Sequence, residues 1–202
     1  MSNWWREHDR TFFPDMNLQS YQRLIIGYHG CDAVVADRVL RSGEGLLPSE
    51  NEYDWLGKGI YFWEHGPERA WEWAKEHHSS PAVVGALIHL GTCFDLLDSR
   101  NTAILGEAFV DYQREMKLMG VRIPKNRGGP DRLRRDRDCA LLNWLLKSLA
   151  RRGLAVFQTV RGTFQEGGEA FPGSGIHAKS HIQVAVRDPA CIIGYFRPSF
   201  LP

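Results

Sequence analysis

The sequence predicts an α+β fold in which a mainly antiparallel β-sheet, divided into two packed parts, carries flanking helices. The first strand-like runs alternate with amphipathic stretches, whereas the later ones have little helix between them, a pattern typical of the α+β class. The chain has 202 residues, of which 43% are hydrophobic, enough for one ordinary core. Because no linker-like segment separates the predicted elements, we expect a single domain over residues 1–202.

The first half of the chain predicts two strand-to-helix units. Residues 23–28 form an apolar run with the length of a buried strand, and Asp32 can cap a helix over residues 33–42. Residues 57–63 place β-forming side chains behind two glycines, and a Gly-Pro pair then starts a second helix at residue 67.

The second half supplies the remaining elements. Further strands are expected over residues 82–90, 155–160, 181–186 and 192–196, and further helices over residues 106–119 and 138–152. The last two strands close the chain around a turn at Arg187-Asp188-Pro189.

Composition favours a cytoplasmic protein. The first residues lack a basic segment followed by an apolar stretch, and no run approaches the roughly 18 apolar residues that a membrane helix needs, so we expect no membrane partner. The four cysteines show no CxxC spacing, which fits a reducing compartment. Two histidine pairs, His77-His78 and His177 with His181, lack a third ligand at a useful spacing, so we assign no metal.

Charge is unevenly distributed along the chain. The net charge is +1, but residues 114–152 carry 12 Lys or Arg against 4 Asp or Glu, and the rest of the chain is acidic. This part is expected to be a basic, largely helical insertion. Its densest stretch favours a polyanionic partner, with solvated helix faces as the alternative. The candidate nucleic-acid-binding residues are Lys125, Arg127, Arg132, Arg134 and Arg135.

A histidine followed by glycine, His29-Gly30, comes after the first strand-like run. The glycine allows a flat polar ligand to approach the main chain, and the imidazole can form a hydrogen bond with a hydroxyl group. A turn with a satisfied histidine is the alternative. A second glycine-rich stretch, Gly57-Lys58-Gly59-Ile60-Tyr61-Phe62, follows about thirty residues later.

Together these two stretches resemble the poly(ADP-ribose) polymerase-like branch of the ADP-ribosyltransferases, which carry a His-Gly pair and a Gly-x-Gly-x-Tyr-Phe stretch at this spacing. The similarity covers residues 27–74 and reappears faintly over residues 180–192. The third signature position of that family is often glutamate, and its best match here is Gln183. The resemblance implies the split, mainly antiparallel sheet of these transferases.

Carried over to this sequence, the resemblance implies NAD as co-substrate, with His29 bonded to a ribose hydroxyl and the Gly30 backbone holding the carboxamide. Tyr61, with Phe62 beside it, would stack on the nicotinamide ring. An aromatic residue of the following helix, Trp73 rather than Trp71, would close the other face, with core packing as the alternative. The expected chemistry is cleavage of the nicotinamide–ribose bond.

The residue at the third position limits the expected reaction. Gln183 keeps an acceptor oxygen but lacks the negative charge of glutamate, so the resemblance implies transfer of a single ADP-ribose unit rather than long chains. Glu166 and Glu169, in a glycine-rich loop, are candidates for deprotonating an acceptor, and Ser174 in the same loop is a candidate ligand-binding residue. A plain solvent loop is the alternative.

Three functions remain compatible with the sequence. The first is a mono-ADP-ribosyltransferase acting on a macromolecule, with nucleic acid favoured over protein by the basic stretch. The second is a binding module that has lost turnover, and the third is an NAD glycohydrolase. The compact size suggests a toxin or a defence effector, a class of protein that can have a neutralising protein partner. Residues 1–21 would form an N-terminal extension.

Overall fold

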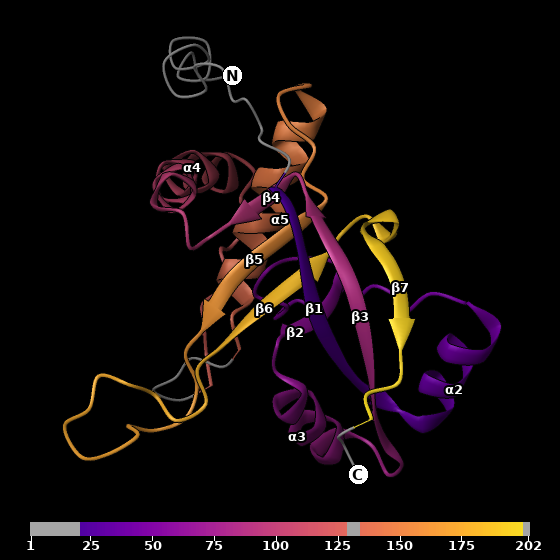
Figure 1. The fold of residues 1–202 in the computed structure, drawn as a ribbon. Coiled ribbons are helices and arrows are strands. Elements are labelled where there is room, and N and C mark those ends of the chain that lie inside the picture. The colour runs from indigo at the N-terminus through magenta and orange to yellow at the C-terminus, as the bar shows by residue number, and fades with distance from the viewer. Residues whose placement is uncertain (1–20, 129–133, 200–202) are drawn as a thin grey trace.

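The computed structural model describes residues 21–128 and 134–199, and its centre is a sheet of seven strands in the order β4-β5-β6-β2-β1-β3-β7 (Figure 1). All neighbouring strands are antiparallel except β4 and β5, which are parallel. The strands are β1 (Tyr21–Asp32), β2 (Ile60–Glu64), β3 (Pro81–Gly91), β4 (Cys93–Asp95), β5 (Thr159–Phe164), β6 (His181–Val186) and β7 (Ile192–Phe196). The predicted mainly antiparallel α+β class is confirmed.

Four α-helices and one short 3-10 helix accompany the sheet within the described residues. They are α2 (Ala33–Ser42), α3 (Pro67–His77), α4 (Ser99–Leu118), α5 (Asp136–Arg151) and η1 (Pro189–Cys191). The chain between β5 and β6 extends away from the sheet as a long loop (Figure 1).

The helices cover both faces of the sheet, as the alternation along β2 demonstrates. Ile60 and Phe62 belong to the core that contains α2, whereas Tyr61 packs against the core of α5 and Trp63 against α3. Since successive side chains of a strand point to opposite faces, α2 lies on one face and α3 with α5 on the other.

The sheet narrows where β1 pairs with β2, a place that we call the join. Strand β1 pairs with β3 over most of its length, but its pairing with β2 consists of Gly27 with Glu64 and Tyr28 with Trp63. On the other side of the join, β2 pairs with β6 along four residues. The seven strands thus form one continuous sheet rather than the two packed parts that the sequence predicted, and the β1–β2 pairing within it is short.

Several predicted boundaries agree with the structure. The strands 181–186 and 192–196 and the helix 33–42 have the expected limits, and Asp32 accepts the Val34 N–H at the helix start. This agreement is physically expected because each of these elements is bounded by a local signal: a capping carboxylate, a left-handed Gly43, or an Asp-Pro turn.

Three predicted boundaries are wrong. Strand β1 does not end at His29-Gly30 but continues to Asp32, because β3 pairs with it throughout. Helix α4 starts at Ser99 rather than residue 106, since Asp98 caps it by accepting the Arg100 N–H. Strand β5 starts at Thr159 rather than residue 155, because Ala155 and Phe157 are buried in the core of α5 before the ladder begins.

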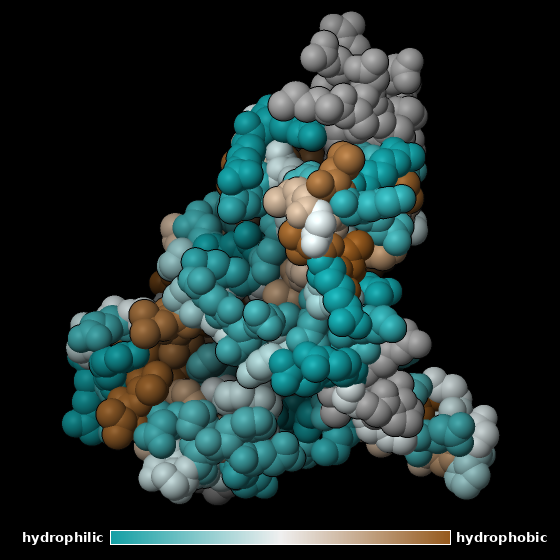
Figure 2. Space-filling model, turned by 180° about the vertical axis from the view of Figure 1, so that it is seen from behind, coloured by the Kyte–Doolittle hydropathy of each residue, from teal (hydrophilic) through white to brown (hydrophobic). Residues whose placement is uncertain are grey.

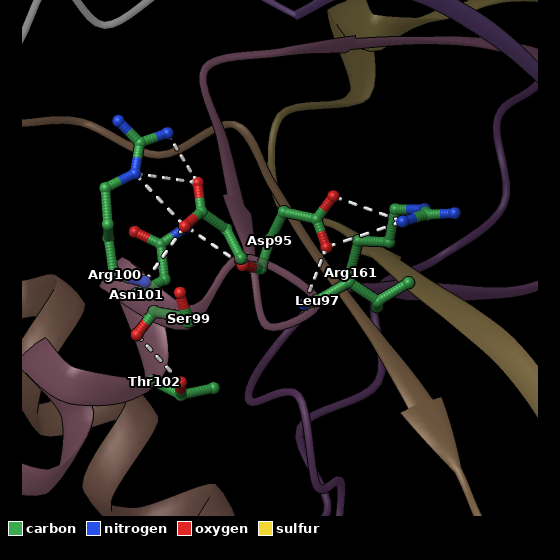
Figure 3. Close-up of polar contacts among 8 residues, drawn as sticks. Asp95, Leu97, Ser99, Arg100, Asn101, Thr102 and Arg161 are labelled. Atoms are coloured by element: carbon green, nitrogen blue, oxygen red, sulfur yellow. Dashed lines mark hydrogen bonds and ion pairs between the residues drawn. The ribbon is translucent and has the colours of Figure 1, made fainter.

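A buried ion cluster ties three strands together on the face away from α5. Arg161 of β5 donates to both oxygens of Glu64, at 2.6 and 2.9 Å, and to Asp95 of β4 at 3.1 Å. Hydrogen bonds to Glu64, followed by its charge and that of Asp95, hold the pKa of Arg161 above its ordinary value. Figure 3 shows Asp95 between Arg161 and the start of α4, where Asn101 donates to its carbonyl.

The surface is mostly polar, with exposed apolar side chains in a few places. Seen from behind, apolar groups gather at the edge that carries α2 and β7 (Figure 2). Val34, Leu47 and Ile193 are among the exposed hydrophobic residues. No helix within residues 21–128 and 134–199 is long and apolar enough to cross a membrane.

Helix α3 lies directly against β1 at Gly30. A Cβ atom added at Gly30 would lie 2.3 Å from the Ala70 carbonyl oxygen and 3.2 Å from the Trp73 ring. The obstructing atom belongs to the helix backbone, so α3 itself would have to move. Gly30 is therefore required by packing, whatever else its backbone does.

We expect Gly30→Ala to lower the free energy of unfolding by about 1–3 kcal/mol, the usual cost of overpacking a core. Gly106→Ala is the matched control, because Gly106 lies within α4 and a Cβ there meets nothing within 4 Å. That control should stabilise the protein by about 0.5–1 kcal/mol through helix propensity. Urea denaturation measures both, and a neutral Gly30→Ala would show that α3 is not held where the structure places it.

Candidate functional site

The three signature positions lie on neighbouring strands around the join of the sheet. His29 is on β1, Tyr61 is on β2, and Gln183 is on β6. Strand β2 lies between the other two, with Trp63 paired to Gln183 and Tyr61 paired to Ala185. The fold thus brings together residues that are far apart in the sequence.

The ladder between β1 and β2 stops at His29, and the histidine takes the place of the next rung. The Ile26 carbonyl accepts the His65 N–H, so the peptide groups of Ile26, Tyr28 and Gly30 point toward β2. A continuing ladder would join Gly30 to Tyr61. The Tyr61 carbonyl instead accepts from His29 Nδ1 at 2.8 Å. The Gly30 N–H and C=O therefore point into the opening between the strands.

His29 is held in one tautomer and in its neutral form. Because a carbonyl oxygen only accepts, Nδ1 carries the hydrogen and Nε2 is an acceptor. Burial lowers the pKa of His29 below its ordinary value, and the nearby His78 acts in the same direction, whereas the hydrogen bond to Tyr61 opposes them. The imidazole therefore presents Nε2 as a neutral acceptor, suited to a hydroxyl group.

Tyr61 has its hydroxyl group fixed by the preceding turn. The hydroxyl donates to the Gly57 carbonyl at 2.8 Å and accepts from the Leu56 N–H at 2.9 Å. Burial raises the pKa of Tyr61 well above its ordinary value, so the phenol stays neutral. With its hydroxyl engaged, Tyr61 contributes its ring rather than an acid or a base to the site.

The glycine-rich turn before Tyr61 is anchored on α5 and β6. Asn143 Oδ1 accepts the Lys58 N–H at 2.9 Å, and Arg187 donates to the Lys58 carbonyl at 3.0 Å. Gly57 has φ 78°, and a Cβ at Gly59 would lie 2.9 Å from the Val186 carbonyl oxygen. The two glycines serve backbone conformation and close strand approach, respectively.

Gln183 is held by a tryptophan that precedes the glycine-rich turn. Trp55 Nε1 donates to Gln183 Oε1 at 2.6 Å, and Trp55 is 8% exposed. The Arg135 guanidinium lies over the rings of Trp55, at 5.1 Å, and Phe164, at 4.2 Å. A positive charge therefore lies one aromatic ring away from Gln183.

The predicted aromatic residues have different surroundings. Trp73 lies over Gly30, beside the opening between β1 and β2, and also packs against Trp63 at 6.0 Å between ring centroids. The Lys75 ammonium group lies over the Trp71 ring, 5.8 Å from the ring centroid. Phe62 is fully buried in the core of α2, with its ring 5.8 Å from that of His29. The structure thus places Phe62, a predicted ligand-binding residue, in the core beside His29 rather than at the surface.

The loop between β5 and β6 contributes one of its predicted residues. Glu166, at its base, accepts from Arg69 of α3 at 2.7 Å and lies 4.0 Å from His181 Nδ1. Glu169 instead accepts the Gly173 N–H, and Ser174 accepts the Ile176 N–H. The structure therefore does not bring Glu169 and Ser174 to the join, because their contacts close the loop on itself.

The predicted basic residues are distributed around the start of α5. Arg127 and Arg134 share the buried Asp136, at 3.1 and 3.4 Å, and Arg134 lies over the Tyr53 ring. Lys125 is exposed. Arg135 reaches the site, as described above. Arg132 and residues 1–20 of the predicted N-terminal extension lie outside the described residues, and Tyr21 already belongs to β1.

Several buried polar atoms without a partner lie on the elements around Gln183, and others, such as Asp111 Oδ2, lie elsewhere. Among the described residues they include Trp63 Nε1, His181 Nε2 and Arg69 Nε. The rings of Trp63 and His181 are 6.1 Å apart, and burial, with the charge of Arg69, lowers the pKa of His181. Native cores satisfy nearly all such atoms, so a polar ligand or water at these positions would supply the missing partners.

Four residues of this site were not predicted from the sequence: Trp55, Arg69, Asn143 and His181 as a site residue. Trp55, Arg69 and Asn143 belong to no local motif, and each reaches the site through a contact across the fold. Only Trp55, two residues before the glycine-rich turn, gave a positional signal.

Comparison with known proteins gives little further information. The chain is 42% identical over 60 residues to an uncharacterized protein of Methanocaldococcus jannaschii, a match that covers 29% of this chain and 27% of that protein. No protein-family model matches the chain. No solved structure matches it either. In the part of the chain that the structure describes, no three His, Cys, Asp or Glu residues gather so as to hold a metal ion.

Two tryptophan variants distinguish a satisfied indole from an unsatisfied one. Trp55→Phe leaves Gln183 Oε1 without its donor. This should lower the free energy of unfolding by about 1–3 kcal/mol, in addition to the cost of the smaller ring. Trp63→Phe removes a buried N–H that has no acceptor, so only the smaller ring costs stability. Chemical denaturation should find Trp55→Phe less stable than Trp63→Phe by at least about 1 kcal/mol. The reverse order would contradict the assigned hydrogen bonds.

Proposed function

We propose that this protein is a mono-ADP-ribosyltransferase that cleaves NAD at the nicotinamide–ribose bond and transfers ADP-ribose to a macromolecule. The observation that carries the proposal is the missing rung between β1 and β2. There the His29 side chain donates a hydrogen bond to the Tyr61 carbonyl, and the Gly30 peptide group is left pointing into the opening. The motif resemblance and this geometry support the same site.

The residues present fit the nicotinamide half of NAD. A carboxamide has one acceptor and one donor group, and the Gly30 N–H and C=O offer the complementary pair on one edge. Trp73 lies over Gly30, and His77 stacks on its ring with the ring centroids 4.3 Å apart, so the aromatic surface left for a ligand is the one turned away from His77. His29 Nε2, neutral and unprotonated, is an acceptor for a ribose hydroxyl.

In the proposed transfer, the bond between the nicotinamide nitrogen and the ribose carbon breaks, and its electron pair leaves with nicotinamide. A nucleophilic oxygen or nitrogen of the acceptor then forms a bond to that carbon and loses its proton. The acceptor oxygen of Gln183 is oriented by Trp55 and stabilises developing positive charge as a dipole. A dipole is weaker than a carboxylate, in keeping with the transfer of a single unit.

Glu166 is the candidate for receiving the acceptor's proton. Its carboxylate is fixed by Arg69 and lies beside His181, at the base of the loop that an acceptor would pass. Glu169 is held inside the loop and has no such position.

The acceptor class favoured by the charges is nucleic acid. Arg135 reaches the site itself, and Arg127 and Arg134 lie just outside it. Clustered arginines suit phosphate groups. A role as a toxin or defence effector, with a neutralising protein partner, is compatible with such an activity.

The test is incubation of the purified protein with NAD labelled in its adenylate half, together with a cell lysate, followed by separate digestion with nuclease and protease. Label lost to nuclease supports the proposal. Label lost to protease indicates a protein acceptor, nicotinamide release without labelled polymer indicates a glycohydrolase, and absence of turnover indicates a binding module.

Variants at the missing rung should separate the roles of the ring and the hydroxyl of Tyr61. We expect His29→Ala and Tyr61→Ala to lower nicotinamide release by about a hundredfold or more, as for loss of groups that orient a reaction. Tyr61→Phe keeps the ring and should retain most of the activity, although it loses two hydrogen bonds and some stability. His89→Ala on β3 is the matched control for His29. Normal activity in both alanine variants would refute the site.

Gln183→Glu tests the third signature position. A carboxylate at this place would still accept from Trp55 and would add negative charge near the ribose, so nicotinamide release should rise about tenfold. Gln165→Glu makes the same charge change on an exposed residue near the base of the loop and should have little effect. An unchanged rate with folded Gln183→Glu would mean that Gln183 does not face the reacting bond.

A further inference from the structure

A row of arginine and aromatic side chains leads from the surface to Gln183. Its members are Tyr53, Trp55, Arg134, Arg135 and Phe164, which we call the arginine–aromatic ledge. They come from the turn before β2, the start of α5 and the end of β5. Neither motif of the sequence included Tyr53, Trp55 or Phe164.

The outer end of the ledge is exposed. The Arg134 guanidinium lies over the Tyr53 ring at 4.9 Å, and Tyr53 is 44% exposed. Asp136 contacts Arg134 at one nitrogen, Nη2, at 3.4 Å, and about half of the arginine side chain is exposed. A planar cation on an aromatic ring offers a flat surface and hydrogen-bond donors together.

The inner end of the ledge reaches the reacting position. Arg135 lies over both Trp55 and Phe164, and Trp55 donates to Gln183. A cation here would not stabilise positive charge on a ribose, so its charge suits an anion that comes close to Gln183. Phosphate is the anion that Arg recognises best through its planar donors.

Charges around the ledge are consistent with an anionic ligand. Asp136 is buried beneath Arg127 and Arg134 rather than between them and solvent. Glu50, the carboxylate three residues before Tyr53, forms an ion pair with Lys58. Tyr53 has two acidic sequence neighbours: Glu52, which is exposed, and Asp54, whose carboxylate accepts the Asn51 N–H.

We propose that the arginine–aromatic ledge binds single-stranded nucleic acid, with an unpaired base stacked on the Tyr53–Arg134 pair and a neighbouring phosphate at Arg135. This inference rests on the proposed function, whose acceptor it narrows to a single strand. Alternating aromatic rings and arginines bind single strands because every unpaired base presents a face for stacking. The stacked bases of a duplex present no such face to a side chain.

Binding is tested on the full-length protein without NAD, by fluorescence anisotropy of a short labelled RNA oligonucleotide and of the matching duplex. We expect the single strand to bind more tightly than the duplex. Tyr53→Ala and Arg134→Ala should each weaken the binding of the single strand by about tenfold, within the usual effect of removing one stacking residue. Both residues are exposed, so the variants should fold normally.

Matched variants separate stacking from general charge. Tyr53→Phe keeps the ring and should bind normally, whereas Arg134→Lys keeps the charge without the planar group and should give an intermediate loss. Arg151→Ala removes an exposed positive charge at the far end of α5 and should change binding less than twofold.

Three outcomes would overturn the inference: duplex bound as tightly as single strand, equal losses in Tyr53→Phe and Tyr53→Ala, or a loss in Arg151→Ala as large as in Arg134→Ala. The inference would also fail if Arg134→Ala raised the KM for NAD but left oligonucleotide binding unchanged. That result would mean that the arginine binds the diphosphate of NAD. If only the proposed function is wrong, the protein binds the single-stranded oligonucleotide but releases no nicotinamide from NAD.

Discussion

The hydrogen bond from His29 Nδ1 to the Tyr61 carbonyl is the contact on which the site depends. Two antiparallel strands that start to pair normally continue until the chain turns, because each unpaired buried peptide group costs free energy. Here a side chain satisfies the carbonyl that the next rung would have used. The strands can therefore separate on either side of the imidazole without leaving that carbonyl unpaired. The opening is a built feature of the sheet, and the same hydrogen bond fixes the tautomer that leaves Nε2 as an acceptor.

Close packing keeps this opening in a fixed place. Helix α3 lies on β1 so closely that only glycine fits at position 30, and β6 lies on the glycine-rich turn closely enough to exclude a Cβ at Gly59. The turn is held further by Asn143 and Arg187, which are on α5 and at the end of β6. Both walls of the opening are thus tied to large elements of the core, as a preorganised site requires.

Charge is distributed differently on the two faces of the sheet. On the face of α2, Arg161 is fully paired with Glu64 and Asp95, which makes a closed structural cluster across three strands. On the face of α3 and α5, some buried polar atoms of the described residues have no hydrogen-bond partner. They include Trp63 Nε1, His181 Nε2 and Arg69 Nε. The second face is therefore the one where a ligand would supply missing interactions.

The sequence by itself determined the class of the fold and most of its local limits, because these follow from short-range signals. Hydrophobic periodicity indicated the strands at 181–186 and 192–196, and Asp32 with Gly43 marked the helix 33–42. The His-Gly pair and the glycine-rich stretch also pointed to residues that the fold brings together.

Tertiary structure decided which rung of the sheet is missing, why Phe62 is core while Trp73 borders the opening, and which glutamate reaches the site. It also decided that Trp55 orients Gln183 and that Arg135 reaches both Trp55 and Phe164. These facts depend on strand register and on contacts between residues up to 128 positions apart, which no local pattern encodes.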